Sequence, residues 1–351
     1  MGFKRYDRGM SFMDMELRRI WGKSRTQRLL ADIDSHVNWE PIDRILVEAY
    51  PVGKSEYGNR AYPPLMLLKA VLLQKWFGIR SDPELENQIN DRISFKVFIG
   101  LPLADPSPDH SVICRFRERV GHKTMEAIHA ELLMQFRSMG FSIESGMAVD
   151  ARLIESASRP VSTEKLEKLR EDREKQDKSI KFQRDVESDW TIKNNVPVFG
   201  MKEHTSIDVD SGLVLSTLVS RASEHDTNYF QYAVLKGIHG EKFPRVVYAD
   251  KGYYGRFNRR FLSMNGIGDG IMRKELVNAK LTDFEIRRNK MISKVRYKIE
   301  QYFGLTALYH EGGKARFTTL VKEGWDRILG AMAFNIKRTI LNKPKVQVAM
   351  A

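Results

Sequence analysis

The hydrophobic periodicity of this chain changes near Gly146, and the change limits the folds that the chain can adopt. Before Gly146, apolar residues recur at helical spacing, for example at Met125, Ile128, Leu132 and Phe136. After it, short apolar runs typical of strands alternate with helical patterns. We expect strands at 147–154, 203–209, 213–220 and 245–250, and helices near 226–237, 256–264, 281–306 and 319–341. Strand pairs followed by strand–helix alternation predict an α/β domain with a mixed sheet, preceded by an all-helical region and ending in helices.

The chain is expected to comprise three regions. Residues 1–60 form a basic N-terminal arm with short helices, 61–141 a helical domain, and 142–345 the α/β domain. Ser81 and Glu84 form a capping box that predicts the start of one helix of the helical domain. A highly charged insertion at about 156–198 interrupts the α/β domain, either as a solvent-exposed helix or as a mobile segment.

The charge balance of the chain favours a polyanionic partner. There are 58 Lys and Arg residues against 45 Asp and Glu residues, a net charge of +13. Such a surplus favours nucleic acid, because each phosphate that is neutralised releases counterions. The alternative is a solvated basic surface without a partner. The charge therefore predicts nucleic acid binding without naming the residues that bind.

The remaining composition narrows the class of protein. The single Cys114 excludes an internal disulfide and a cysteine-based zinc site. No run of 18 apolar residues occurs, so no transmembrane helix and no membrane partner are expected. The first ten residues lack the apolar core of a signal peptide, so we expect a cytoplasmic protein.

Three acidic residues occupy positions where a charge has no structural reason to be. Asp150 and Asp250 each end an apolar run, and Glu300 borders the apolar stripe of its helix. Carboxylates that converge at strand ends lose hydration and repel one another unless a cation is supplied, so they suit a hard divalent metal. The alternatives are local ones: Asp150 facing water at a strand end, Asp250 in a glycine turn, and Glu300 in an exposed ion pair with Arg296.

The order of these motifs resembles the DDE transposases of bacterial insertion sequences, specifically the insertion-sequence-five group. The stretches that carry the resemblance are Met147–Asp150, Val247–Tyr253 and Arg296–Gly304, with support from Phe95–Leu101 and Pro108–Arg117. The three acidic motifs are specific in combination, and the resemblance extends over most of the chain.

The resemblance implies an RNase H-like catalytic core in which Asp150, Asp250 and Glu300 are the catalytic and metal-binding residues. Two Mg²⁺ ions, or Mn²⁺ in their place, are expected to activate the attacking oxygen and stabilise the leaving one. The implied reaction is cleavage of double-stranded DNA at the terminal inverted repeats of the element. The freed 3′-hydroxyl is then transferred into target DNA. A homodimer or higher oligomer is expected in the synaptic complex, and the resemblance implies a bacterial, nucleoid-associated enzyme.

The chain departs from the family signature at two positions. The family places a Tyr three residues before Arg296 and a Lys seven residues after Glu300, where this chain has Ser293 and Ala307. Lys294 or Lys314 are the candidates to replace the phosphate contacts made there.

The helical domain at 61–141 is expected to bind DNA, and further residues are assigned to DNA binding. Arg296, Lys294 and Lys298 lie on the helix of Glu300. Lys251 and Tyr253 follow Asp250, Arg115 and Arg119 share one face of a candidate recognition helix, and Trp190 lies in the insertion. Trp190 either stacks on a flipped or terminal base or packs onto the protein core.

Two other functions compete with transposition. One is an RNase H-fold nuclease that cleaves DNA without joining it. The other is a non-catalytic DNA-binding protein whose acidic residues are relics. The presence of all three acidic residues disfavours the second alternative, and the sequence does not separate the first from a transposase.

Overall fold

The computed structural model forms two compact units. Unit 1 comprises Met1–Gly140 with Met332–Ala351, and unit 2 comprises Phe141–Ala331. The residues described are 2–4, 6, 15–16, 19, 22, 24–53, 60–141, 145–175, 184–240, 243–276, 279–310 and 312–342. Within the expected arm at 1–60, residues 1, 5, 7–14, 17–18, 20–21, 23 and 54–59 lie outside these ranges. The expected division into three domains stays a prediction.

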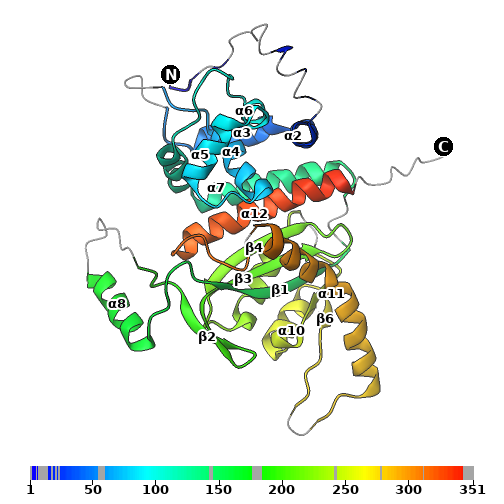
Figure 1. Ribbon diagram of the computed structural model, residues 1–351. Helices are drawn as coiled ribbons and strands as arrows, with labels where there is room; N and C mark the ends of the chain where they lie inside the picture. The colour runs from blue at the N-terminus through cyan, green and yellow to red at the C-terminus, as the bar shows by residue number, and fades with distance from the viewer. Residues whose placement is uncertain are drawn as a thin grey trace, which may run out of the picture. The chain divides into compact units, whose positions relative to one another are not determined.

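Unit 1 is helical, as expected. Its helices are α2 (Arg25–His36), α3 (Trp39–Ala49), α4 (Pro64–Phe77), α5 (Asp82–Asp91), α6 (Ile93–Ile99) and α7 (His110–Ser138), drawn from blue to green in Figure 1. The end of α12 (Leu320–Leu341) belongs to the same unit, where the Trp76 indole N–H donates to the carbonyl of Ala333 (3.0 Å). Ten of the residues of α4 are buried, so this helix forms the centre of the unit.

The helix ends of unit 1 follow from local chemistry. Ser81 caps α5 by accepting a hydrogen bond from the backbone N–H of Glu84 (3.2 Å), which confirms half of the expected capping box. The candidate recognition helix with Arg115 and Arg119 and the helical pattern from Met125 to Phe136 are joined in α7, which bends at Gly121 (φ 71°, ψ 165°). That backbone conformation is accessible in practice only to glycine, so Gly121 permits the bend.

Unit 2 is built on a mixed sheet. Its strands are β1 (Met147–Glu155), β2 (Asp189–Lys193), β3 (Val196–Asp208), β4 (Val214–Arg221), β5 (Val246–Ala249) and β6 (Gly268–Ile271). The strand order is β2-β3-β1-β5-β6, and β4 also pairs with β3. β1 is antiparallel to β3 and parallel to β5, which is parallel to β6. The sheet confirms the expected α/β class, and the strands expected at 203–209 and 213–220 pair as β3 and β4.

The strand β2 was missed by the sequence reading. It pairs with the start of β3 through a turn at Asn194 and Asn195, both with positive φ (50° and 63°). Two consecutive positive φ values are typical of a type I′ hairpin turn, which asparagine tolerates. An Asn-Asn pair beside Pro197 is a weak hairpin signal, so the pattern did not predict this strand.

Helices cover both faces of the sheet. α11 (Asp283–His310) packs against β1, β3 and β5, while α9 (Phe230–Lys236) packs against β1, β3 and β4, and α10 (Arg256–Met264) against β6 (Figure 1). Side chains alternate between faces along a strand. Glu203 reaches Tyr302 of α11, whereas Ser206 bonds to Ser216, which in turn bonds to the Ala233 carbonyl of α9. α11 and α9 therefore cover opposite faces.

The charged insertion contains a helix, α8 (Thr163–Lys175), which confirms the first of the two alternatives for this segment. Its Leu166 is fully buried in a small cluster with Val186 and Phe199. None of the described helices is long and apolar enough to cross a membrane.

Candidate functional site

The two aspartates lie beside each other on neighbouring strands. β1 and β5 run in parallel with Ala148 opposite Tyr248, so two residues further along Asp150 comes beside Asp250. Asp150 lies within β1, and Asp250 follows β5 directly. The charge of Asp250 contributes to the pKa of Asp150, as expected for close carboxylates. The sheet thus brings together two of the three predicted acidic residues.

Asp150 is held in a partly desolvated position. Its Oδ2 accepts a hydrogen bond from Nη2 of Arg296 (2.6 Å), and its Oδ1 accepts one from the N–H of Ala151 (2.9 Å). Burial raises the pKa of Asp150 to about 6, and the Arg296 guanidinium offsets only part of that effect. One cation therefore does not fully compensate the buried carboxylate.

Asp250 follows the end of β5, as predicted, and it also lies in a glycine turn, which was the local alternative. It caps a single turn, η2 (Lys251–Tyr253), by accepting from the N–H of Gly252 (2.6 Å). A Cβ at residue 252 would lie 2.8 Å from Oδ1 of Asp250, so glycine allows this close approach. The turn fixes the orientation of the carboxylate at the end of β5.

Glu300 lies at the border between the buried and the exposed face of α11. It lies on α11 one turn after Arg296 and is exposed, while Ile299 and Tyr302 are buried against the sheet. The buried side chains set the rotation of the helix, which leaves Glu300 at its border, as the sequence pattern predicted. Within the described ranges, the three carboxylates do not come within 4.8 Å of one another as a group.

A different set of ligand-type atoms lies within 4.8 Å of one another in unit 1, namely those of Glu86, Asp109 and His110. Capping and ion pairing account for this set. Asp109 caps α7 at the N–H of Ser111 (2.7 Å), and Glu86 accepts from both the backbone N–H and Nδ1 of His110 (each 2.9 Å). Its polar atoms therefore have partners within the protein.

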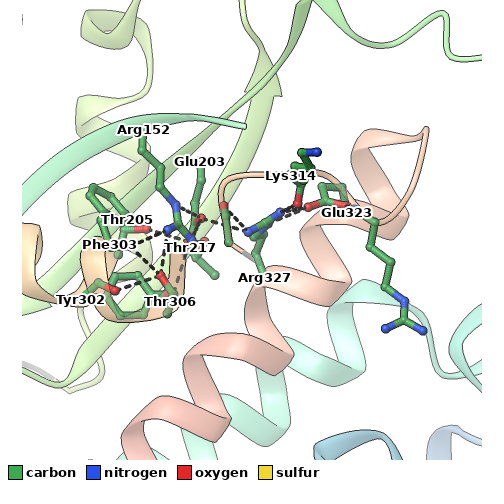
Figure 2. A network of polar contacts seen from close by, with 12 residues as sticks. Arg152, Glu203, Thr205, Thr217, Tyr302, Phe303, Thr306, Lys314, Glu323 and Arg327 are labelled. Atoms are coloured by element: carbon green, nitrogen blue, oxygen red, sulfur yellow. Dashed lines mark hydrogen bonds and ion pairs between the residues drawn. The ribbon is translucent and has the colours of Figure 1, made fainter. Parts of the chain in front are cut away.

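A buried polar network holds α11 against the sheet (Figure 2). Arg152, two residues after Asp150 and on the same face of β1, forms an ion pair with the fully buried Glu203 of β3 (2.7 Å). Arg152 also donates to the carbonyl of Phe303 (3.1 Å) and to the hydroxyl of Thr306 (2.7 Å) on α11. These contacts fix the C-terminal half of α11 to β1.

The network continues to α12. Arg327 lies 3.7 Å from Glu203, donates to the carbonyls of Gly312 (2.9 Å) and Lys314 (2.8 Å), and pairs with Glu323. Burial alone would raise the pKa of Glu203, but the two arginines outweigh it and hold the pKa below its ordinary value. The sequence reading missed this network, although Glu203–Ser206, a polar run inside an expected strand, was a signal for it.

The residues assigned to DNA binding fall into three groups. The exposed ones are Lys251, Lys294, Arg115 and Arg119. Ser293 and Ala307, where the chain departs from the family signature, are exposed as well, and so is Lys314, a candidate replacement for the lost phosphate contacts. Arg296 is buried against Asp150, and Lys298 donates to the carbonyl of Asp210 (2.5 Å).

Tyr253 and Trp190 form the third group, whose rings pack against other aromatic side chains. Tyr253 is 1% exposed and packs against Phe230, so its ring does not reach a bound strand in this conformation. Trp190 packs against Phe199 and donates to the carbonyl of Val161 (2.7 Å), which is the core alternative. The apolar surface of an aromatic ring favours burial in both cases.

The pair of aspartates fits a divalent metal ion. Two neighbouring carboxylates supply the oxygen ligands that hard cations prefer, and one of them is desolvated. The raised pKa of Asp150 indicates that Arg296 leaves negative charge uncompensated. Asp150 and Asp250 are therefore the residues that would hold such an ion.

Two family models match the chain. The model described as "Transposase DDE domain" matches residues 142–336, and the model "Transposase domain (DUF772)" matches residues 21–119. Among solved structures, the chain is similar to a piggyBac transposase synaptic complex with hairpin DNA, at 9% identity and a TM-score of 0.40, covering 94% of this chain and 84% of that one. It is also similar to a pre-cleavage Mos1 transpososome, at 9% identity and a TM-score of 0.21, covering 84% and 83%. The DDE domain model, at residues 142–336, spans nearly all of unit 2.

Proposed function

We infer the function of this chain from one premise: it belongs to the DDE transposase family, because the DDE domain model matches residues 142–336, more than half of its length. The chain is therefore a transposase, an enzyme that cleaves DNA and transfers a strand. Its mixed sheet with helices on both faces is the RNase H-like fold that this membership implies.

We propose that Asp150, Asp250 and Glu300 are the catalytic carboxylates. The observation that carries the proposal is the pairing of Asp150 and Asp250 at neighbouring positions of two parallel strands, with Arg296 donating to Asp150. Glu300 is the acidic residue that α11 carries one turn beyond that arginine. Because the side chain of Glu300 is exposed, it can change rotamer, and thus its distance from the two aspartates, without repacking the core.

Enzymes of this family use divalent metal ions, and we propose Mg²⁺ here, held by Asp150 and Asp250 with Glu300. When bound, the metal supplies a Lewis acid that activates the attacking oxygen and stabilises the leaving oxygen of the phosphodiester. Arg296 orients Asp150 through its 2.6 Å hydrogen bond and lowers the cost of the buried negative charge. The N–H of Gly252 orients Asp250 in the same way.

The DNA partner follows from charge and position. Lys251 directly follows Asp250, Lys294 lies six residues before Glu300, and both are exposed. Arg115 and Arg119 are exposed on α7 of unit 1. Exposed cations of this kind neutralise backbone phosphates. We propose double-stranded DNA carrying the ends of the element as the substrate, bound by two or more copies of this chain. The order of the acidic motifs supports placing it in the insertion-sequence-five group.

The experiment compares the wild type with Asp150→Asn, Asp250→Asn and Glu300→Gln on labelled DNA that carries the ends of the element, with Mg²⁺. Each variant is expected to lose cleavage and strand transfer while still shifting the DNA in a gel. Glu86→Gln, which alters the carboxylate set of unit 1, is the matched control and is expected to keep cleavage.

Cleavage retained by any one of the three variants removes that residue from the catalytic set. Cleavage by the wild type without a joined product favours a nuclease.

A further inference from the structure

Three arginines from separate segments of unit 2 converge on one carboxylate beside the candidate site. Asp269 lies on the edge strand β6, and its oxygens are 3.4 Å from Nε of Arg259, 3.4 Å from Nη1 of Arg273 and 3.7 Å from Nη2 of Arg288. Arg259 belongs to α10, Arg273 follows β6, and Arg288 belongs to α11. We call these three side chains the arginine cluster.

The hydrogen-bonding capacity of the arginine cluster is not used up. Nε and Nη2 of Arg259 are buried and have no hydrogen-bond partner among the described residues. The Asp269 carboxylate accepts a hydrogen bond from the N–H of Ile271 (2.9 Å), and its contacts with the arginines are longer, at 3.4–3.7 Å. Buried donors without acceptors are costly. The Arg259 side chain is 29% exposed, so a shift of its guanidinium towards a bound anion would give these donors acceptor oxygens.

The arginine cluster is also held in place. The guanidinium of Arg259 lies over the ring of Tyr254, 4.2 Å from its centroid. Asn289 bonds to both the N–H (2.9 Å) and the carbonyl (3.0 Å) of Arg273. Arg288 donates to the carbonyls of Ile271 (2.8 Å) and Asp269. A ligand would therefore meet donors that are already ordered, which lowers the entropic cost of binding.

The local charge matches one phosphodiester. Three guanidinium groups face the carboxylate of Asp269. Two of them, Arg288 and Arg259, also act on the carboxylate of Glu285, whose pKa is lowered chiefly by hydrogen bonds from Thr282. Three positive and two negative groups leave one positive charge. A backbone phosphate of DNA carries one negative charge, and the planar fork of arginine matches its oxygens.

The arginine cluster adjoins the candidate carboxylates along the sheet. The N–H of Met272 bonds to the carbonyl of Ala249 (3.0 Å), the residue before Asp250, and Sδ of Met272 lies 3.9 Å from Nη1 of Arg296. Arg273 is the next residue along the chain. A DNA strand with its reacting phosphate at Asp150 and Asp250 would thus place another phosphate near Arg273.

We propose that Arg259, Arg273 and Arg288 form a binding site for a backbone phosphate of the DNA strand that lies at the carboxyl edge of the sheet. The proposal rests on the proposed function, because it takes the strand to be a substrate of Asp150 and Asp250. The cluster binds phosphate without reading base sequence.

The test measures the salt dependence of DNA binding by the full-length protein. Fluorescence anisotropy of a labelled duplex is recorded with EDTA from about 50 to 200 mM salt, a range in which counterion release dominates affinity. Arg259→Gln and Arg273→Gln are each expected to lower the slope of log Kd against log salt by about 0.9, the value for one lost phosphate contact. Arg44→Gln removes an exposed arginine paired with Glu40 at 3.7 Å, and is expected to keep the wild-type slope.

A second pair of variants is expected to strengthen DNA binding instead of weakening it. Asp269→Asn removes the carboxylate that competes with the phosphate, and is expected to bind DNA more tightly than the wild type. Glu40→Gln removes one negative charge from the control pair and is expected to tighten binding less. If the cluster only stabilised the fold, Asp269→Asn would lower the melting temperature without tightening binding.

The outcomes separate this proposal from the proposed function. Wild-type slopes in both arginine variants overturn the proposal, whereas cleavage by the wild type still supports the function. Arg273→Lys tests the site if a glutamine variant does not fold: it is expected to keep the salt slope and bind more weakly, because lysine keeps the charge without the fork. If inorganic phosphate raises the melting temperature of the wild type but not of Arg273→Gln, and the glutamine variants keep the wild-type salt slope, the site takes free phosphate and the DNA assignment is overturned.

Discussion

At the scale of single residues, the two aspartates differ in how their charge is compensated. Asp150 is buried and relies on Arg296, whereas Asp250 lies at a strand end and bonds to the N–H of Gly252. Both positions stood out in the sequence, because each aspartate follows an apolar run, although β1 continues beyond Asp150 to Glu155. The sequence did not predict that Arg296 bonds to Asp150, since the two are 146 residues apart and only the packing of α11 on β1 joins them.

The pairing of Asp150 with Arg296 should appear as strong energetic coupling. Arg296→Gln alone leaves a buried carboxylate without its cation and is expected to lower the free energy of unfolding by about 3 kcal/mol. Asp150→Asn with Arg296→Gln should cost clearly less than the sum of the single changes, a coupling of about 1–3 kcal/mol. Urea unfolding of the four proteins without metal measures this cycle, and strict additivity would show that the 2.6 Å contact carries no energy.

The buried His204 should make the protein sensitive to acid. Burial lowers the pKa of His204 to about 4, and its ring stacks on Tyr229 with Nε2 bonded to Ser220. The unfolded chain takes up a proton below its ordinary pKa of 6.5, whereas the folded chain does so only near 4. The stability that neutral His204 contributes is therefore complete above pH 6.5 and is lost as the pH falls towards 4, up to about 3 kcal/mol.

The measurement compares the wild type with His204→Gln by urea unfolding at several pH values from 7.5 down to 4.5. The variant should lose less stability on acidification than the wild type. Parallel curves for the two proteins would rule out His204 as a source of acid sensitivity.

At the scale of elements, α11 links the stability of the fold to the candidate site. Arg152 and Glu203 tie its C-terminal half to β1 and β3 (Figure 2). Glu300 belongs to that same half, and Arg296 lies at the middle of the helix. The sequence predicted the helix and the border position of Glu300 from the apolar stripe. It did not predict the buried network, because burial of Glu203 depends on two arginines and a tyrosine hydroxyl that come from three other elements.

Two glycines in long helices should respond in opposite directions to alanine. Gly121 has φ 71° in α7 and open space around a built Cβ, so Gly121→Ala is expected to cost about 1–3 kcal/mol through backbone strain alone. Gly330, inside α12, also has open space around its Cβ and no positive φ. Gly330→Ala is therefore expected to stabilise the protein by about 0.4–1 kcal/mol.

Urea unfolding of the two alanine variants measures these changes. A Gly121→Ala protein as stable as the wild type would mean that α7 is straight in solution.

At the scale of the whole molecule, the periodicity of the sequence predicted which class of element each segment forms, and tertiary context determined the rest. The change at Gly146 marked the passage from helices to a mixed sheet, and the structure places β1 directly after it. The strand β2 and the continuity of α7 were missed, because both depend on backbone conformations at Asn194, Asn195 and Gly121 that composition alone does not specify. The family match then identifies as an RNase H-like core the sheet that the pattern could only class as α/β.

The central claim is that Asp150, Asp250 and Glu300 form the metal site of this transposase. Anomalous diffraction from crystals of the full-length protein grown with Mn²⁺ tests it most directly, because manganese can be located without reference to activity. We expect anomalous peaks bridging the carboxylates of Asp150 and Asp250, with Glu300 turned towards them, and no such peaks in Asp150→Asn. Manganese bound only at Glu86, Asp109 and His110, or absent from the two aspartates at saturating concentration, would contradict the account.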